Sequence, residues 1–192
     1  MTRVVLLLTI LTACHPYVTG GYDVSSTVSG PMSSLMGESV ETARTLPGQT
    51  ALAAAPASPS HTYSLAVGFG TKDFGVEIGA HEYGASSSMF DTADSAQRYV
   101  TTTGSVDLKW APVRWKYFSA YVHAGPSVGV VVDKGAQSTT FGQGVRYGGG
   151  VAVTLPVVML YLDASRTALQ MADGDAKGFN QLGGITVGIG IH

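Results

Sequence analysis

The feature that most constrains the fold of this chain is a regular alternation of apolar residues with small or polar ones, which begins at Thr62 and continues to the C-terminus. A period of two is typical of β-strands that present one face to an apolar environment, because successive side chains point to opposite faces of a sheet. Seven segments carry this pattern. In the last of them the apolar row is Ile185, Val187, Ile189 and Ile191. The sequence therefore predicts an all-β domain.

The first fourteen residues have a different character. One positive charge at Arg3 precedes a short apolar run over residues 4–11, which is the outline of a secretory signal peptide and is too short to span a bilayer as a helix. The tetrapeptide Leu11-Thr12-Ala13-Cys14 resembles the lipobox of bacterial lipoproteins. The resemblance implies that residues 1–13 are removed, that Cys14 carries the lipid, including palmitate, and that His15 after it directs the protein to the outer membrane. The alternative is an ordinary signal peptide with a chance cysteine.

The connections between the alternating segments differ in length. Those near residues 71–73, 111–114 and 155–157 are short, whereas those near 83–97, 133–139 and 168–178 are long. Outer-membrane barrels have short periplasmic turns and long outer loops. If the last strand ends in the periplasm, a barrel of seven strands would begin on the outer side, which is opposite to a periplasmic anchor. We therefore expect an eighth strand over about 18–29. It is followed by a loop over about 30–61 and by the remaining strands over 62–192. The alternative is a tether from Cys14 to Ser60 and a seven-stranded sheet.

The two faces of the predicted strands indicate which side meets lipid. The apolar row carries almost no charge, while the opposite row holds Glu77, Asp107, Arg146 and Asp163 among glycines and serines. Only 12% of the residues are charged, and 25 of the 192 are glycine, which suits a sheet whose outer surface is not dissolved in water. A membrane barrel faces lipid with its apolar row and has a polar interior. We therefore predict an antiparallel up-and-down transmembrane β-barrel of eight strands, residues 14–192, in the outer membrane.

Residues 62–192 resemble the small eight-stranded outer-membrane barrels such as the OmpA transmembrane domain and OmpX. The resemblance lies in glycine-rich alternating strings, namely residues 147–153, 160–163 and the Gly-Ile-Thr-Val-Gly-Ile-Gly-Ile segment that ends at Ile191. It concerns architecture only, and two features depart from it. The chain ends in His192 where such barrels end in an aromatic residue. Pro126 falls within a strand, where proline removes a hydrogen-bond donor, and we expect it to mark a bend above the bilayer.

Two groups of polar residues are candidates for chemistry, and each also has a structural interpretation. We expect Glu77, Asp107, Arg146 and Asp163 to form a static polar network in the lumen, with Arg146 nearly opposite Ser165 and paired to Asp163 or another inward acid. His123 and Ser127 share a face, and residues 125–129 match the Gly-x-Ser-x-Gly string. That motif needs a strand-to-helix turn, so filling of the lumen is the favoured interpretation. The alternative is a lipid A esterase-type barrel, which needs these two side chains on the lipid side.

The expected function is a non-enzymatic, lipid-anchored envelope protein without a cofactor or a metal. Its expected partners are outer-membrane lipid and lipopolysaccharide, together with other envelope proteins at loops 30–61 and 83–97. A net charge of −2 gives no basic patch for nucleic acid. The runner-up is a periplasmic lipoprotein with a lipocalin-like barrel, in which the row containing Leu65, Val76, Val122 and Val187 would point inward.

Overall fold

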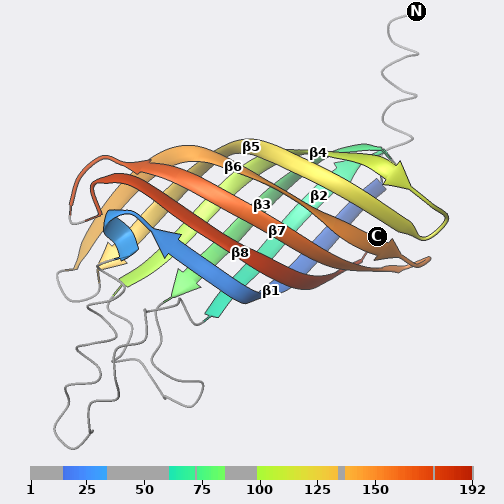
Figure 1. Cartoon of the computed structure of the whole chain (residues 1–192), viewed down its shortest axis with the longest axis horizontal. Helices are drawn as coiled ribbons and strands as arrows, with labels where there is room; N and C mark the ends of the chain where they lie inside the picture. Colours follow the sequence, from blue (N-terminus) through green and yellow to red (C-terminus); the bar gives the residue numbers. More distant parts are fainter. Residues whose placement is uncertain are drawn as a thin grey trace, which may run out of the picture.

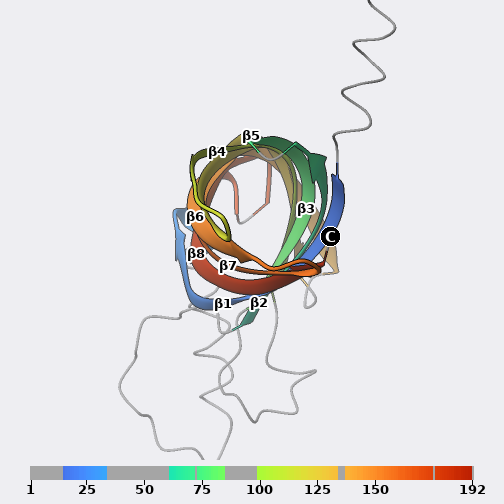
Figure 2. The ribbon, with the colours of Figure 1, turned by 90° about the vertical axis from the view of Figure 1, so that its right-hand side faces the viewer.

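Eight antiparallel strands pair in chain order, and β1 pairs with β8 to close them into a barrel (Figure 1; Figure 2, in the view turned by 90°). The structure is a computed structural model that describes residues 15–33, 61–71, 73–84, 99–133, 137–174 and 176–191. The strands are β1 (His15–Ser29), β2 (His61–Gly70), β3 (Phe74–Gly84), β4 (Tyr99–Arg114), β5 (Phe118–Asp133), β6 (Ser138–Thr154), β7 (Val158–Met171) and β8 (Gly178–Ile191). The predicted fold class and the eighth strand are confirmed.

The ladder registers keep the apolar rows on one face around the whole ring. Val67 of β2 pairs with Ile78 of β3, and Ile78 pairs with Val106 of β4. All three side chains are exposed on the outside of the barrel. The row that faces the lumen is mostly buried, because an eight-stranded barrel has an interior that its own side chains fill. The apolar face of the sheet is therefore the outer face of the barrel.

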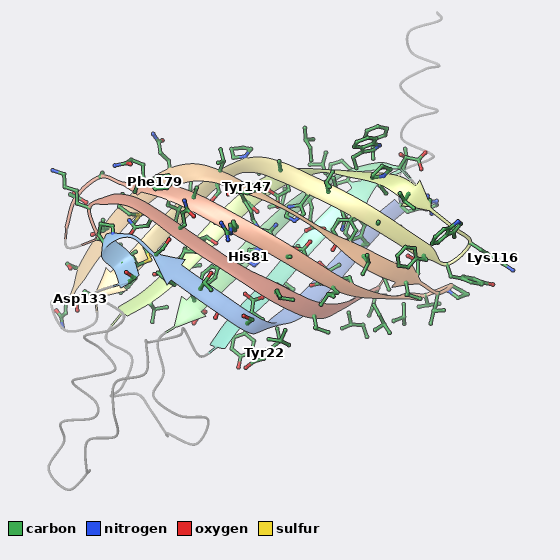
Figure 3. All side chains as sticks on the ribbon, in the orientation of Figure 1. Tyr22, His81, Lys116, Asp133, Tyr147 and Phe179 are labelled. Carbon is green, nitrogen blue, oxygen red and sulfur yellow. The ribbon has the colours of Figure 1, made fainter. Side chains whose placement is uncertain are left out.

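The barrel has two different ends. The three tight turns that join β2 to β3, β4 to β5 and β6 to β7 lie at one end, together with His15 and Ile191. Each turn closes in the same way: the N–H of the residue that opens it donates to the carbonyl three residues later, as in Thr71 to Phe74 at 2.7 Å. In Figure 3, Lys116 marks this end and Asp133 marks the end of the long connections. We call these the turn end and the loop end.

Several boundaries differ from the sequence-based expectation. The short turn predicted at 111–114 is wrong, because β4 continues to Arg114 and the chain turns at 115–117. A register shift between Trp110 and Val113 accommodates Pro112 in the strand, as bulges do. The first strand starts at His15 rather than about residue 18, and β7 continues to Met171 before a loop that reaches only to residue 177.

We expected Pro126 to mark a bend above the bilayer, but β5 continues through it. It lies in the middle of β5, exposed on the outer face and paired with Val145 of β6. On the other side, the β4–β5 ladder runs from Ser105–Ser127 directly to Leu108–Ala124 and omits the pairs between them. Proline has no N–H to donate there. The β4–β5 ladder therefore has a local gap next to the residue that cannot donate a hydrogen bond.

The described part of the chain contains hardly any helix. One turn over residues 31–33 follows β1 at the loop end (Figure 1). Among the described residues, no helix is long and apolar enough to cross a membrane.

Candidate functional site

The centre of the lumen holds a cluster of buried charges. Arg146 of β6 extends its guanidinium towards two acids: its Nη1 pairs with Asp107 of β4, and its Nη2 lies 3.7 Å from Oδ1 of Asp163 of β7. The Nη2 group also donates to the hydroxyl of Ser165 at 3.1 Å. The side chains of all three charged residues are at most 7% exposed. Because buried charges are tolerated only when they are paired, these contacts fix the three residues as one unit.

His123 of β5 completes this unit from the other side. Its Nδ1 lies 3.4 Å from Oδ2 of Asp107, and its Nε2 lies 3.2 Å from Oδ2 of Asp163. Arg146 and His123 therefore bridge the same two carboxylates. The Nε2 atom is also within hydrogen-bonding distance of Oδ1 of Asp163, at 3.3 Å, whereas Nδ1 faces Asp107 without a hydrogen bond. We call Asp107, His123, Arg146 and Asp163 the central ring.

A second polar cluster lies beside the central ring, towards the turn end. Glu77 of β3 accepts a hydrogen bond from the hydroxyl of Tyr17 at 3.0 Å and lies 3.5 Å from Nζ of Lys109. The same ammonium lies 4.0 Å from the centre of the Tyr121 ring, a cation–π distance. Glu77 and Asp107 are ladder partners on β3 and β4, so the two clusters adjoin each other.

The loop end of the lumen is filled by apolar side chains instead. Met32 follows β1, turns back into the barrel and is 1% exposed. It packs in a cluster with Tyr83, Val131, Leu169, Met171, Ala176 and Leu182. Asn180 of β8 holds this arrangement, since its side-chain oxygen accepts from the Met32 N–H at 2.7 Å and its amide donates to the Ala176 carbonyl at 2.8 Å. We call this cluster the apolar plug.

The lumen contains different amounts of free space along the barrel axis. The polar clusters surround a cavity of about 20 Å³ that His81, Lys109 and Tyr161 help to line, enough for about one water molecule. At the turn end the barrel opens into a wider cavity of about 580 Å³, which reaches inward to Lys109 and Tyr121. The lumen is therefore a vestibule that is closed by a polar layer and then by an apolar one.

The sequence-predicted network residues are brought together in part. Asp107, Arg146 and Asp163 share the central ring, whereas Glu77 belongs to the neighbouring cluster with Lys109 and Tyr17. Arg146 pairs in the ladder with Thr167 rather than lying nearly opposite Ser165, because the turn at 155–157 sets the β6–β7 register. The guanidinium still reaches Ser165 and Asp163 diagonally.

Sequence reasoning missed the position of His123 in the central ring and the whole apolar plug. For His123 the signal was present, since it shares the lumen-facing row with Tyr121, but a pairing across the lumen is invisible in a strand pattern. Asp23 and Thr186, which are hydrogen-bonded to each other inside the barrel, were likewise not singled out. Cys14 lies outside the described residues, as does most of the predicted loop 30–61 and of loop 83–97.

The esterase-type candidates do not have the surroundings that an acyl-chain enzyme needs. His123 and Ser127 are both buried on the lumen side, and Ser127 lies within β5 with no helix after it. The Gly-x-Ser-x-Gly string at 125–129 is therefore part of a strand. Among the residues that the structure describes, no group of three or more His, Cys, Asp or Glu side chains is placed to hold a metal ion.

A closed ring of eight antiparallel strands with a mainly apolar outer surface and buried ion pairs at the centre of the lumen is typical of the small eight-stranded outer-membrane barrels. The comparison with solved structures agrees at the level of the fold. The chain is similar to Neisserial surface protein A, with a TM-score of 0.61 and 15% identity over 93% of this chain and 97% of that one. It is also similar to the attachment invasion locus protein of Yersinia pestis in complex with the heparin analogue sucrose octasulfate, with a TM-score of 0.51 and 16% identity over 92% and 96% of the two chains. No family model and no curated protein matches the sequence.

Proposed function

We propose that this protein is a lipid-anchored outer-membrane barrel that acts as a structural or partner-binding component of the envelope, and not as a channel or an enzyme. The observation that carries the proposal is the inverted polarity of the barrel. Leu65, Val122 and Val187 point outward and are 60%, 48% and 48% exposed, while Asp107 and Arg146 inside are 1% and 5% exposed. Such an outer surface is stable in hydrocarbon and costly in water.

Aromatic side chains support a membrane-spanning position. Phe74 and Trp110 stack near the turn end, with ring centres 6.3 Å apart. Phe179, which Figure 3 labels, and Phe141 are exposed on the outer face towards the loop end. Aromatic rings of this kind gather at both boundaries of the apolar band in outer-membrane barrels. The turn end would then face the periplasm.

The position of the proposed anchor agrees with that orientation. Strand β1 begins at His15, directly after Cys14, so a lipid on Cys14 would enter the periplasmic leaflet beside the turn end. The short turns give the same orientation independently.

The closed lumen favours a role at the loop end. In the described part of the barrel, the central ring and the apolar plug lie between the vestibule and the loop end, which favours a lumen that does not pass solutes. The long connections after β1, β3, β5 and β7 all leave the barrel at the loop end. We therefore place the partner-binding surface, for other envelope proteins, at that end.

The alternative functions lack support in the geometry. A lipocalin-like cup requires the row with Leu65, Val122 and Val187 to point inward, and these side chains point outward. A lipid-modifying enzyme requires His123 and Ser127 on the lipid side, and both face the lumen.

The proposal is tested on membranes from cells that express the full chain. We expect the protein to resist alkaline extraction, to migrate faster on gels before boiling than after it, and to give no steady conductance in planar bilayers. Cys14→Ser should lose palmitate labelling and keep the heat-dependent shift. Release by alkali without a shift would refute the membrane barrel. Conductance steps would refute the closed lumen, and palmitate retained in Cys14→Ser would refute the anchor.

A further inference from the structure

One charged side chain lies on the outer face within reach of the apolar band. Arg166 of β7 is exposed, and the outward residues that precede it on this strand are Leu160, Leu162 and Ala164. The ion pairs found among the described residues do not include it. Glu82, an acid on the same outer face, belongs to β3, which lies on the opposite side of the ring from β7. The charge of Arg166 thus has no acidic neighbour in the part of the protein that the structure describes.

A glycine on the neighbouring strand makes room for this side chain. Arg166 pairs with Gly183 of β8, and Gly183 pairs with Thr27 of β1. A Cβ atom on Gly183 would lie 3.1 Å from Cγ of Arg166 and 3.3 Å from Oγ1 of Thr27. The stem of the arginine therefore lies over the glycine, next to the threonine hydroxyl. A larger residue at position 183 would press on both groups.

These residues line a groove on the outer face. It has a volume of about 390 Å³, and its lining includes the hydroxyl groups of Ser25, Thr27 and Tyr147 together with Arg166. Figure 3 labels Tyr147 of β6 near the middle of the barrel's length, and Arg166 lies on the half of β7 that leads to Met171 at the loop end. Further towards that end on β6 and β8, the outer face carries Gln143 and Gln181 and then the exposed aromatic residues Phe141 and Phe179, which are of the kind that marks the boundary of the apolar band. The groove therefore lies inside this boundary, and the long side chain of Arg166 can extend its guanidinium towards the headgroups of the outer leaflet.

A cation at this depth has a natural partner in a lipid phosphate. An arginine on the lipid face costs least near the interface, and its planar guanidinium binds phosphate oxygens through two parallel hydrogen bonds. The hydroxyl of Ser25 beside it can donate to a remaining oxygen, and that of Thr27 can do so by giving up its 3.5 Å hydrogen bond to the Gly183 carbonyl. We infer that Arg166, lying across Gly183 beside Thr27 and Ser25, binds the phosphoryl group of an anionic lipid in the leaflet nearest the loop end.

This inference rests on the proposed membrane location, and its test keeps the two apart. Refolded full-length protein in detergent micelles is titrated with lipid A, with dephosphorylated lipid A, with phosphatidylglycerol and with inorganic phosphate. Binding is followed by native mass spectrometry and by the NMR signal of the Arg166 Nε–H group. Heat-dependent gel migration of every variant shows separately whether the barrel itself has folded.

Four variants make the test specific. Arg166→Gln should weaken binding of the phosphorylated lipid about tenfold or more, the size expected for loss of hydrogen bonds to a charged group, and Gly183→Val should weaken it in the same direction. Arg114→Gln removes an equal charge at the turn end, and Gly104→Val adds the same side chain on β4, where the nearest atom to a new Cβ is 3.6 Å away. Both control variants should bind as the unmodified protein does.

The lipid probes identify the source of the phosphate. Binding of lipid A that depends on Arg166 and on the phosphates supports a glycolipid site, and equal binding of phosphatidylglycerol supports a phospholipid as the source. Unchanged lipid binding by folded Arg166→Gln would overturn the inference. Equal loss in Arg114→Gln, or binding of inorganic phosphate without either lipid, would also overturn it.

Discussion

At the scale of the residue, the side of the wall on which a side chain lies decides its surroundings. Asp107 and Leu108 are adjacent in β4, yet Asp107 is 1% exposed and Leu108 is 69% exposed. The first contacts an arginine and a histidine inside the barrel, and the second belongs to the outer apolar surface. Substitutions of neighbouring residues should therefore have unrelated effects.

Loss of Arg146 tests the central ring. Arg146→Ala leaves Asp107 and Asp163 buried without their fixed cation, so the free energy of unfolding should fall by about 3–5 kcal/mol. The measurement is urea unfolding in micelles, followed by tryptophan fluorescence. Arg166→Ala, which removes the same side chain from the outer face, serves as the control and should change the free energy by less than about 1 kcal/mol. An unchanged midpoint for Arg146→Ala would contradict the ion-pair account.

The sequence predicts which residues line the lumen far better than which of them meet. The period of two assigns Asp107, Arg146 and Asp163 to one face without reference to any partner. Contacts such as that between Asp107 and Arg146 join β4 to β6 across the lumen. They depend on the stagger of the strands, which turns and bulges set, and a single-strand pattern carries no information on that stagger.

At the scale of the element, the β4–β5 seam is a tightly constrained part of the wall. Its ladder is interrupted opposite Pro126, and a Cβ on Gly125 would collide with the backbone carbonyl of Val106. Backbone cannot move aside as a side chain can. The glycine before Pro126 is therefore required by close approach of the two strands.

Substitution of Gly125 tests this close approach. Gly125→Ala should lower the free energy of unfolding by about 1–3 kcal/mol, the usual cost of overpacking. Gly79→Ala is the matched control in the lumen, because the nearest atom to its new Cβ is 3.5 Å away. Chemical unfolding of both variants side by side gives the comparison. Equal stabilities of the two would show that the seam tolerates a side chain.

The apolar plug is the element that the sequence pattern could not predict. Val130, Val131 and Val132 follow one another in β5, so the alternation that reveals the two faces is lost near the loop end. Met32 reaches the plug only because Gly30 adopts a φ of 92°, a left-handed conformation that favours glycine. The chain can then turn back into the barrel mouth.

Truncation of Met32 tests whether the plug stabilises the barrel. Met32→Ala removes a side chain that is 1% exposed, and the expected loss is about 2–5 kcal/mol of unfolding free energy. Met159→Ala, at the open vestibule, should cost clearly less. Thermal unfolding of both variants, followed by circular dichroism, measures the two losses of stability. A Met32→Ala variant as stable as the unmodified protein would mean that the plug contributes no packing energy.

At the scale of the whole molecule, polarity is arranged in two directions. Across the wall it runs from an apolar outside to a polar inside, and along the axis it runs from an open vestibule through the central ring to the apolar plug. The fold class, the inverted wall and the gathering of the short turns at one end were all predictable from alternation and loop lengths. The axial layers were not, because they arise from side chains of non-adjacent strands.

The central claim is that the outer apolar row meets lipid while the lumen does not. The most direct measurement is a set of nuclear Overhauser contacts between lipid acyl chains and isotope-labelled methyl groups of the protein in lipid nanodiscs. We predict strong contacts for Leu65, Val122 and Ile189, and none for Leu169 and Leu182, which are fully buried in the plug. Acyl-chain contacts to Leu169 and Leu182 with none to the outer row would contradict the account.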